Sequence, residues 1–156
     1  MKFCFVGISS RLPPWLEQLT LDYKKKISFW IETECIVLNS PSHDRDAQDK
    51  KIKSESEIIL NYLKPDDFVL LCDEKGQRLD TKAFSKRLER ILGGGKKRII
   101  VVIGGAYGVN DEVKKRADLQ LCLSEFTITH HLALAVACEQ TYRAMTILKG
   151  TSYHNG

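Results

Sequence analysis

The sequence has little of what marks membrane or secreted proteins. No stretch of its 156 residues approaches the roughly 18 consecutive apolar residues that a membrane-spanning helix needs. The apolar run after Lys2 is too short for a secretory signal and ends at Ser9. The five cysteines stand singly, without Cys-x-x-Cys spacing, which argues against a disulfide framework or a zinc site. We therefore expect a cytoplasmic protein with reduced thiols and no membrane association.

Common nucleotide and metal signatures are also missing. No Gly-Lys-Ser/Thr follows a predicted strand, so there is no P-loop. Gly104, Gly105 and Gly108 give G-G-x-x-G after the fourth predicted strand, whereas a dinucleotide site has G-x-G-x-x-G after the first. His130 and His131 cannot both face one ion from the start of a helix, and no acid or thiol lies at ligand spacing. We expect neither an NAD site nor a metal.

What the sequence does contain is a regular alternation of strands and helices. Apolar runs predict strands at 2–8, 35–38, 68–72, 99–103 and 119–123, with a turn at 73–76. Three- and four-residue spacings of apolar residues predict helices at 15–29, 58–63 and 132–148. The helix at 58–63 follows a charged stretch at 43–57. Two more helices are expected, one between Asp80 and Gly93 and a short one that begins after Asn110. This order predicts one α/β domain over 1–156, with a mainly parallel sheet of five to six strands flanked by helices.

The loops at the carboxyl ends of the strands are the expected ligand site. Residues 99–103 are all β-branched and do not alternate with polar residues, which indicates a central, parallel strand. The paired Gly104 and Gly105 that follow allow close approach of a ligand, or simply form a tight turn. If strands four and five are neighbours, loop 123–128 lies beside this turn, and two backbone-lined loops suit an adenosine group.

The C-terminal third combines an apolar helix with a basic tail. Helix 132–148 is apolar on more than one face, which is typical of core or of a dimer interface. The net charge is +4, and residues 140–156 contain no acid. The basic clusters at 96–98 and 114–116 are solvated faces or contacts for a polyanion.

Together these residues resemble a known family, the ribosomal RNA large-subunit methyltransferase H proteins, which belong to the SPOUT class of knotted methyltransferases. The resemblance covers the whole chain and is carried by Ile103-Gly104-Gly105-x-x-Gly108, Leu123-Ser124-x-Phe126-Thr127, His130, Glu139-Gln140-x-Tyr142-Arg143-Ala144 and Tyr153-His154.

The resemblance implies an enzyme that uses S-adenosylmethionine to methylate N3 of a pseudouridine in 23S ribosomal RNA on assembled ribosomes. It also implies a homodimer and a C-terminal trefoil knot. The implied cofactor contacts are Cys72, Gly104, Gly105, Leu123, Ser124, Glu125, Phe126, Thr127 and Ile128. Two positions depart from the family pattern, which generally has Leu at Cys72 and Pro at Thr129.

For the chemistry, the N3 proton must leave, and His154 or His130 is the candidate base. We favour His154, because a tail that orders over bound RNA closes the site only when substrate is present. Tyr153 would stack on or hydrogen-bond a base, and Arg143 would contact a phosphate. The alternative for Tyr153 is a frayed terminus with no role, and the alternative for Arg143 is an exposed charge on a helix. The rival functions are a non-catalytic RNA- or ribosome-binding module of the same fold and a flavodoxin-like nucleotide-binding domain.

Overall fold

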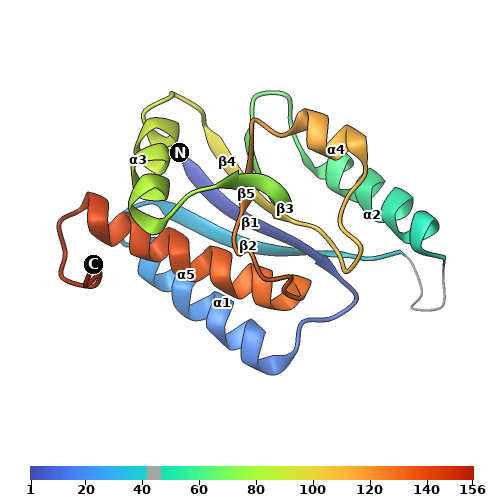
Figure 1. Ribbon diagram of the computed structural model, residues 1–156, viewed down its shortest axis with the longest axis horizontal. Coiled ribbons are helices and arrows are strands. Elements are labelled where there is room, and N and C mark those ends of the chain that lie inside the picture. Colours follow the sequence, from blue (N-terminus) through green and yellow to red (C-terminus); the bar gives the residue numbers. More distant parts are fainter. Residues whose placement is uncertain (42–46) are drawn as a thin grey trace.

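The computed structural model describes residues 1–41 and 47–156. Within these ranges five strands alternate with five helices, as the sequence predicts (Figure 1). The elements are β1 (Lys2–Ser9), α1 (Pro14–Ile27), β2 (Glu32–Asn39), α2 (Gln48–Tyr62), β3 (Phe68–Arg78), α3 (Thr81–Leu92), β4 (Arg98–Ile103), α4 (Asp111–Arg116), β5 (Leu119–Cys122) and α5 (His130–Leu148). Of the charged stretch at 43–57, the part from Gln48 onward is helical, and 43–46 lies outside the described residues.

The five strands form one sheet in the order β2-β1-β4-β3-β5, and each of its strand pairs is parallel. Strand β4 lies between β1 and β3, which confirms the central position predicted for 99–103. Its side chains from Ile99 to Ile103 are all buried.

Helices cover both faces of the sheet (Figure 1). Because side chains alternate along a strand, Phe3 and Phe5 join one core cluster with α1, α3 and α5, whereas Cys4 and Val6 join a second cluster with α2 and α4. Helix α5, which is apolar on more than one face, packs against α1, α3 and the sheet. Among the described residues, no helix combines the length and the apolar character needed to cross a bilayer.

Side-chain caps fix two helix starts next to the carboxyl end of the sheet. The Asp80 carboxylate accepts from the Ala83 N–H at 2.8 Å at the start of α3. The Asn110 side chain accepts from the Val113 N–H at 3.1 Å at the start of α4. Each bond satisfies a backbone donor that the first turn of a helix leaves unpaired. Of the two candidate caps for α3, Asp80 and Thr81, the structure uses Asp80. The cap expected at Asn110 is confirmed, and it holds the end of the glycine loop.

One expectation about strand β3 is wrong. The predicted turn at 73–76 does not end the strand, which continues to Arg78. Instead the ladder to β5 is interrupted, since Cys72 and Gln77 are both paired with Leu121 and residues 73–76 bulge between them. A Cβ at Gly76 would lie only 2.6 Å from the backbone of β5, so the return of the strand requires glycine there.

The condition set for loop 123–128, that strands four and five are neighbours, is not met. Strand β3 lies between β4 and β5 in the sheet. The loops after β4 and β5 therefore flank the end of β3, and the residue at that end, Cys72, stands between them. The order of strands depends on pairing between residues far apart in the chain, which local apolar patterns do not encode.

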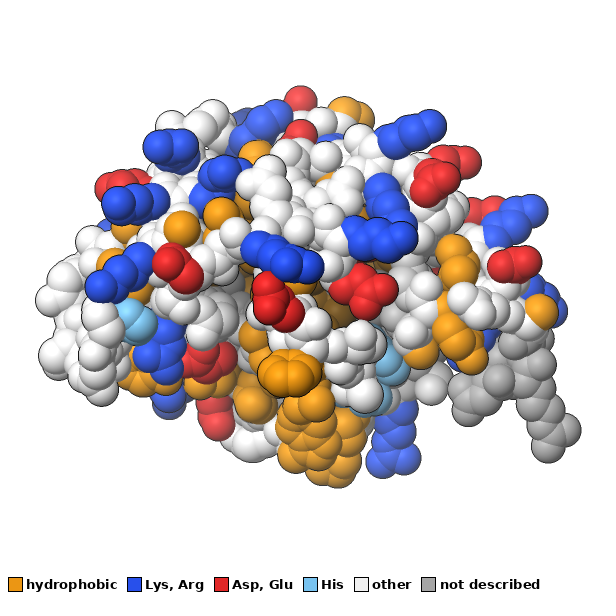
Figure 2. All heavy atoms as spheres, in the orientation of Figure 1, with side chains coloured by type: hydrophobic (Ala, Val, Ile, Leu, Met, Phe, Trp, Pro, Cys, Tyr) orange, Lys and Arg blue, Asp and Glu red, His pale blue; other side chains and the backbone are white. Residues whose placement is uncertain are grey.

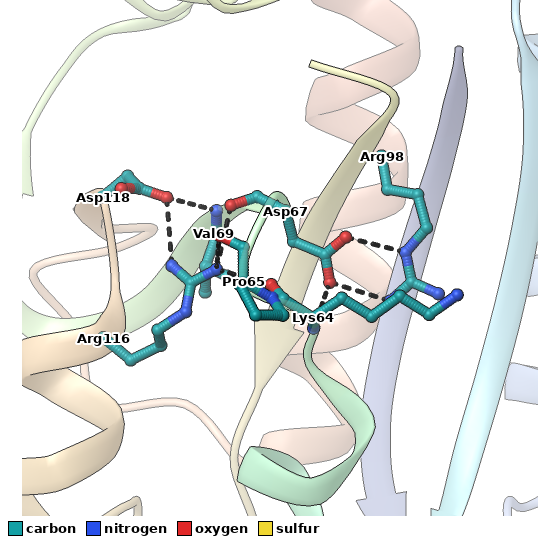
Figure 3. A network of polar contacts seen from close by, with 7 residues as sticks. All are labelled: Lys64, Pro65, Asp67, Val69, Arg98, Arg116 and Asp118. Atoms are coloured by element: carbon teal, nitrogen blue, oxygen red, sulfur yellow. Dashed lines mark hydrogen bonds and ion pairs between the residues drawn. The ribbon is translucent and has the colours of Figure 1, made fainter.

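A polar network ties the amino ends of β3 and β4 together, at the opposite end of the sheet from these loops (Figure 3). Asp67, only 3% exposed, accepts from Nε and Nη2 of Arg98, both at 2.8 Å, and from the Lys64 N–H at 2.7 Å. Arg116 donates to the carbonyl oxygens of Lys64 and Asp67 and contacts Asp118. Paired, hydrogen-bonded charges of this kind are how a buried carboxylate is tolerated.

Candidate functional site

A cavity of about 440 Å³ opens at the carboxyl ends of β3, β4 and β5. Its size falls in the range of small-molecule sites. Of the nine residues predicted to contact a cofactor, all but Glu125 line it: Cys72, Gly104, Gly105, Leu123, Ser124, Phe126, Thr127 and Ile128. The structure thus brings three loops together around one space, although their order across the sheet differs from expectation.

The glycine loop forms one wall and is packed closely from behind. Gly108 has a φ of +80°, and its N–H donates to the Gly105 carbonyl at 3.0 Å. A Cβ at Gly104 would lie 2.9 Å from Val109 Cγ1, and a Cβ at Gly105 would overlap the carboxylate of Glu55. Side chains at either position would push the loop forward into the cavity. Glycine therefore keeps the backbone itself at the cavity wall.

Glu55 supports this loop and is not predicted from the sequence. It lies on α2, is 4% exposed, and its Oε2 accepts from Ser40 Oγ at 2.7 Å. In the sequence it stands in a run of charges that is typical of a solvated helix face. Only the packing of α2 against the glycine loop buries it.

The end of β3 supplies an apolar wall and a charged rim. Burial, and secondarily the charge of Asp73, raises the pKa of the Cys72 thiol to about 12, so the side chain is a neutral, apolar surface. Asp73, Glu74, Lys75 and Lys114 also line the cavity, and Lys114 Nζ lies 4.0 Å from Asp73 Oδ2. Figure 2 shows basic and acidic side chains around a hollow in the middle of this face.

The loop between β5 and α5 holds its shape through its own polar groups. Ser124 Oγ accepts from the Phe126 N–H at 3.0 Å, and the Ser124 carbonyl accepts from Cys122 Sγ at 3.0 Å. Glu125 does not line the cavity, because its carboxylate pairs with Arg78 Nη1 at 3.0 Å on the exposed side. Phe126 lines the cavity and is 82% exposed.

His130 lines the cavity from the first residue of α5. Burial, then the neighbouring His131 and Lys51, lower the pKa of its imidazole, so the ring is neutral at pH 7 and can accept a proton. The preceding residue, Thr129, caps the helix by accepting from the Leu132 N–H at 3.3 Å. Thr129 has a φ of −64°, the value that proline imposes. A proline at position 129 would therefore fit the same backbone conformation.

His131, the next residue, does not line the cavity. Its Nε2 lies 3.3 Å from Ser9 Oγ at the end of β1, which ties the start of α5 to the sheet. Among the described residues, no group of three or more His, Cys, Asp or Glu side chains is placed to hold a metal ion.

The other predicted reacting residues form a second cluster at the far end of α5. Arg143, Tyr153 and His154 gather around Glu139, and none of them lines the cavity. Arg143 is thirteen positions after His130 on the same helix, which places the two about 20 Å apart at a rise of about 1.5 Å per residue. Within one chain the structure does not bring His154 to the cavity.

Comparisons with known proteins agree with this geometry. A family model described as "Predicted SPOUT methyltransferase" matches residues 1–154. A protein named ribosomal RNA large subunit methyltransferase H, from Bdellovibrio bacteriovorus, is 46% identical over 155 residues, covering 99% of each chain. A protein of the same name from Christiangramia forsetii is 37% identical over 141 residues, covering 90% of each. The crystal structure of tRNA (m1G37) methyltransferase from Aquifex aeolicus has the same fold, with a TM-score of 0.50 at 20% identity over 92% of this chain and 70% of that one.

Proposed function

This chain belongs to the SPOUT methyltransferases, within the ribosomal RNA large subunit methyltransferase H family, and we propose that it methylates N3 of a pseudouridine in 23S ribosomal RNA with S-adenosylmethionine. The observation that carries the proposal is the cavity between the Gly104-Gly105 turn and the 123–128 loop. Family membership supplies the reaction class, and the specific nucleotide rests on the family resemblance.

The residues present fit an adenosyl ligand. Gly104 and Gly105 expose backbone where any Cβ would collide, and Cys72 gives a neutral surface suited to a flat base. Leu123, Ser124 and residues 126–128 of the following loop close the opposite side. Apolar walls with a few backbone polar groups are what small-molecule sites of this kind present.

The cofactor, when bound, supplies a methyl group on a sulfonium, open to in-line attack. The protein's main task is then to hold the acceptor nitrogen in line with that methyl group, and orientation alone can contribute about 7–11 kcal/mol to lowering a barrier. The N3 proton must also leave. His130 is neutral and lines the cavity, so it is placed to accept a proton.

We propose that the site is completed by a second copy of the chain. His154 and Tyr153 lie at the far end of α5 from their own cavity, so a partner's tail must supply them. Exposed apolar side chains stand near the cavity end of the molecule, with Phe126 at 82%, Trp15 at 49% and Leu132 at 46% exposure. Sedimentation at micromolar concentration should show a dimer, and a monomer would contradict the composite site.

We also propose that residues 1–156 act as one domain in the cytoplasm, where ribosomes are. The C-terminal part would form the trefoil knot of the class. Support for the knot comes from the path of α5, which follows the edge strand β5 yet packs against β1 and β4 across the sheet. A crystal structure of the dimer tests both the knot and the placement of the tail.

The direct test is methyl incorporation into ribosomes from cells that lack this modification. We expect transfer to N3 of a pseudouridine and saturable binding of S-adenosylmethionine by calorimetry. His154→Ala should lower methylation strongly and leave cofactor affinity nearly intact. Asn155→Ala, a change at the adjacent exposed residue, is the matched control. If the protein binds ribosomes but no S-adenosylmethionine, it is a non-catalytic module of this fold.

A further inference from the structure

Three side chains at the end of α5 form a chain of hydrogen bonds with a defined direction. Arg143 donates from Nε and Nη2 to Glu139 Oε1, at 2.9 Å and 2.7 Å. The remaining nitrogen, Nη1, lies 3.3 Å from Nδ1 of His154. The Tyr153 ring covers the guanidinium at 4.7 Å, and its hydroxyl donates to Glu139 Oε1 at 3.3 Å.

The direction of the last bond decides which nitrogen of His154 carries a proton. A guanidinium has only donors and stays charged in proteins, so Nδ1 must accept and carries no proton. A doubly protonated imidazole would set an N–H and a positive charge against Arg143. In this arrangement Nδ1 is the acceptor, and the N–H of the His154 ring is on Nε2.

The carboxylate of Glu139 fixes the orientation of Arg143, and further hydrogen bonds fix Glu139 in turn. The Glu139 Oε2 accepts from Gln140 Nε2 at 2.7 Å, and Gln140 Oε1 accepts from Thr81 Oγ1 at 2.7 Å. Thr81 is the first residue of α3, so the tail is tied through these bonds to the body of the domain.

Building on the proposed function, we propose that the Glu139–Arg143 pair makes His154 a hydrogen-bond donor to the acceptor base instead of the group that removes its N3 proton. When N3 loses its proton to His130 or to water, negative charge spreads to the flanking carbonyl oxygens. A donor aimed at such an oxygen stabilises the charge where it develops. Glu139 and Arg143 act as positioning residues, and a guanidinium neutralised by Glu139 is a weak phosphate contact.

In the present arrangement the Nε2 edge of His154 lies against Gly156, the last residue. An acceptor base that takes the Nε2 proton in a hydrogen bond must displace this residue.

The activity test compares two replacements of His154. The amide nitrogen of Gln can donate at nearly the position of Nε2 but cannot act as a base, and Ala can do neither. We expect His154→Gln to keep kcat within about tenfold of the native protein and His154→Ala to lose about 100-fold or more. Equal loss in both variants overturns the donor role, since a general base is removed equally by either change.

A second measurement does not depend on methylation. Nitrogen-15 NMR of the full-length protein without RNA at pH 7, with His154 assigned by comparison with His154→Gln, should show a proton on Nε2 and none on Nδ1. In Arg143→Met the two tautomers should mix, while S-adenosylmethionine affinity stays unchanged. A proton on Nδ1 in the native protein, or no response to Arg143→Met, overturns the inference. Absence of methyl transfer with the expected spectrum would instead refute the proposed function alone.

Discussion

Replacing Gly105 by Ala should weaken cofactor binding through steric overlap alone. Gly105 does not have a positive φ, so alanine can adopt its backbone conformation, and the cost comes from the overlap of the new Cβ with the Glu55 carboxylate. Glu55 is buried and held by Ser40, so it cannot swing freely into solvent. Overpacking of this kind costs about 1–3 kcal/mol. If the loop yields by moving into the cavity, S-adenosylmethionine should bind about 5- to 150-fold more weakly.

The double variant Glu55→Ala/Gly105→Ala isolates the cause. Glu55→Ala alone loses one hydrogen bond and some packing, worth about 1 kcal/mol, but it also empties the space that the new Cβ needs. We expect the double variant to bind better than the sum of the single effects, with a coupling of about 0.5–3 kcal/mol. Titration calorimetry measures each affinity.

Gly93→Ala is the matched control, because at the end of α3 its Cβ would meet only backbone oxygens, Glu89 O at 3.4 Å and Arg90 O at 3.8 Å. It should leave affinity unchanged. Additive effects of the two changes, or Gly105→Ala binding as tightly as the control, would refute the assignment of Glu55 as the support of the cofactor loop.

Three further outcomes are expected. Asp67→Ala leaves Arg98 without its two 2.8 Å bonds and should cost about 3–5 kcal/mol in urea unfolding. The double variant with Arg98→Ala should recover part of this, and full additivity would contradict the pairing. Cys72, whose pKa burial raises to about 12, should react with iodoacetamide only slowly up to pH 9, because the thiolate forms only near that pKa; fast labelling by mass spectrometry would contradict this. Thr129→Pro should change stability by less than about 1 kcal/mol, since the φ already suits proline and only the capping bond is lost; a larger loss in thermal unfolding would count against it.

Much of the architecture follows from local pattern. The buried, β-branched run at 99–103 and the caps at Asp80 and Asn110 predict their elements because such signals depend on neighbouring residues in the chain. The rule that ligands bind beyond the carboxyl ends of parallel strands then selects the loops around the cavity. Local pattern does not show that β3 lies between β4 and β5, because the order of strands is set by pairing between residues far apart in the chain.

The sequence by itself determined the alternating elements, the loops that carry the site and, through family resemblance, the reaction class. Only the tertiary structure decided that Glu55 is buried behind Gly105, that β3 bulges at 73–76, and that Arg143 lies against Nδ1 of His154. The physical reason is distance along the chain. Glu55 and Gly105 are far apart in sequence, and the environment that buries a carboxylate or orients an imidazole exists only once those segments have packed together.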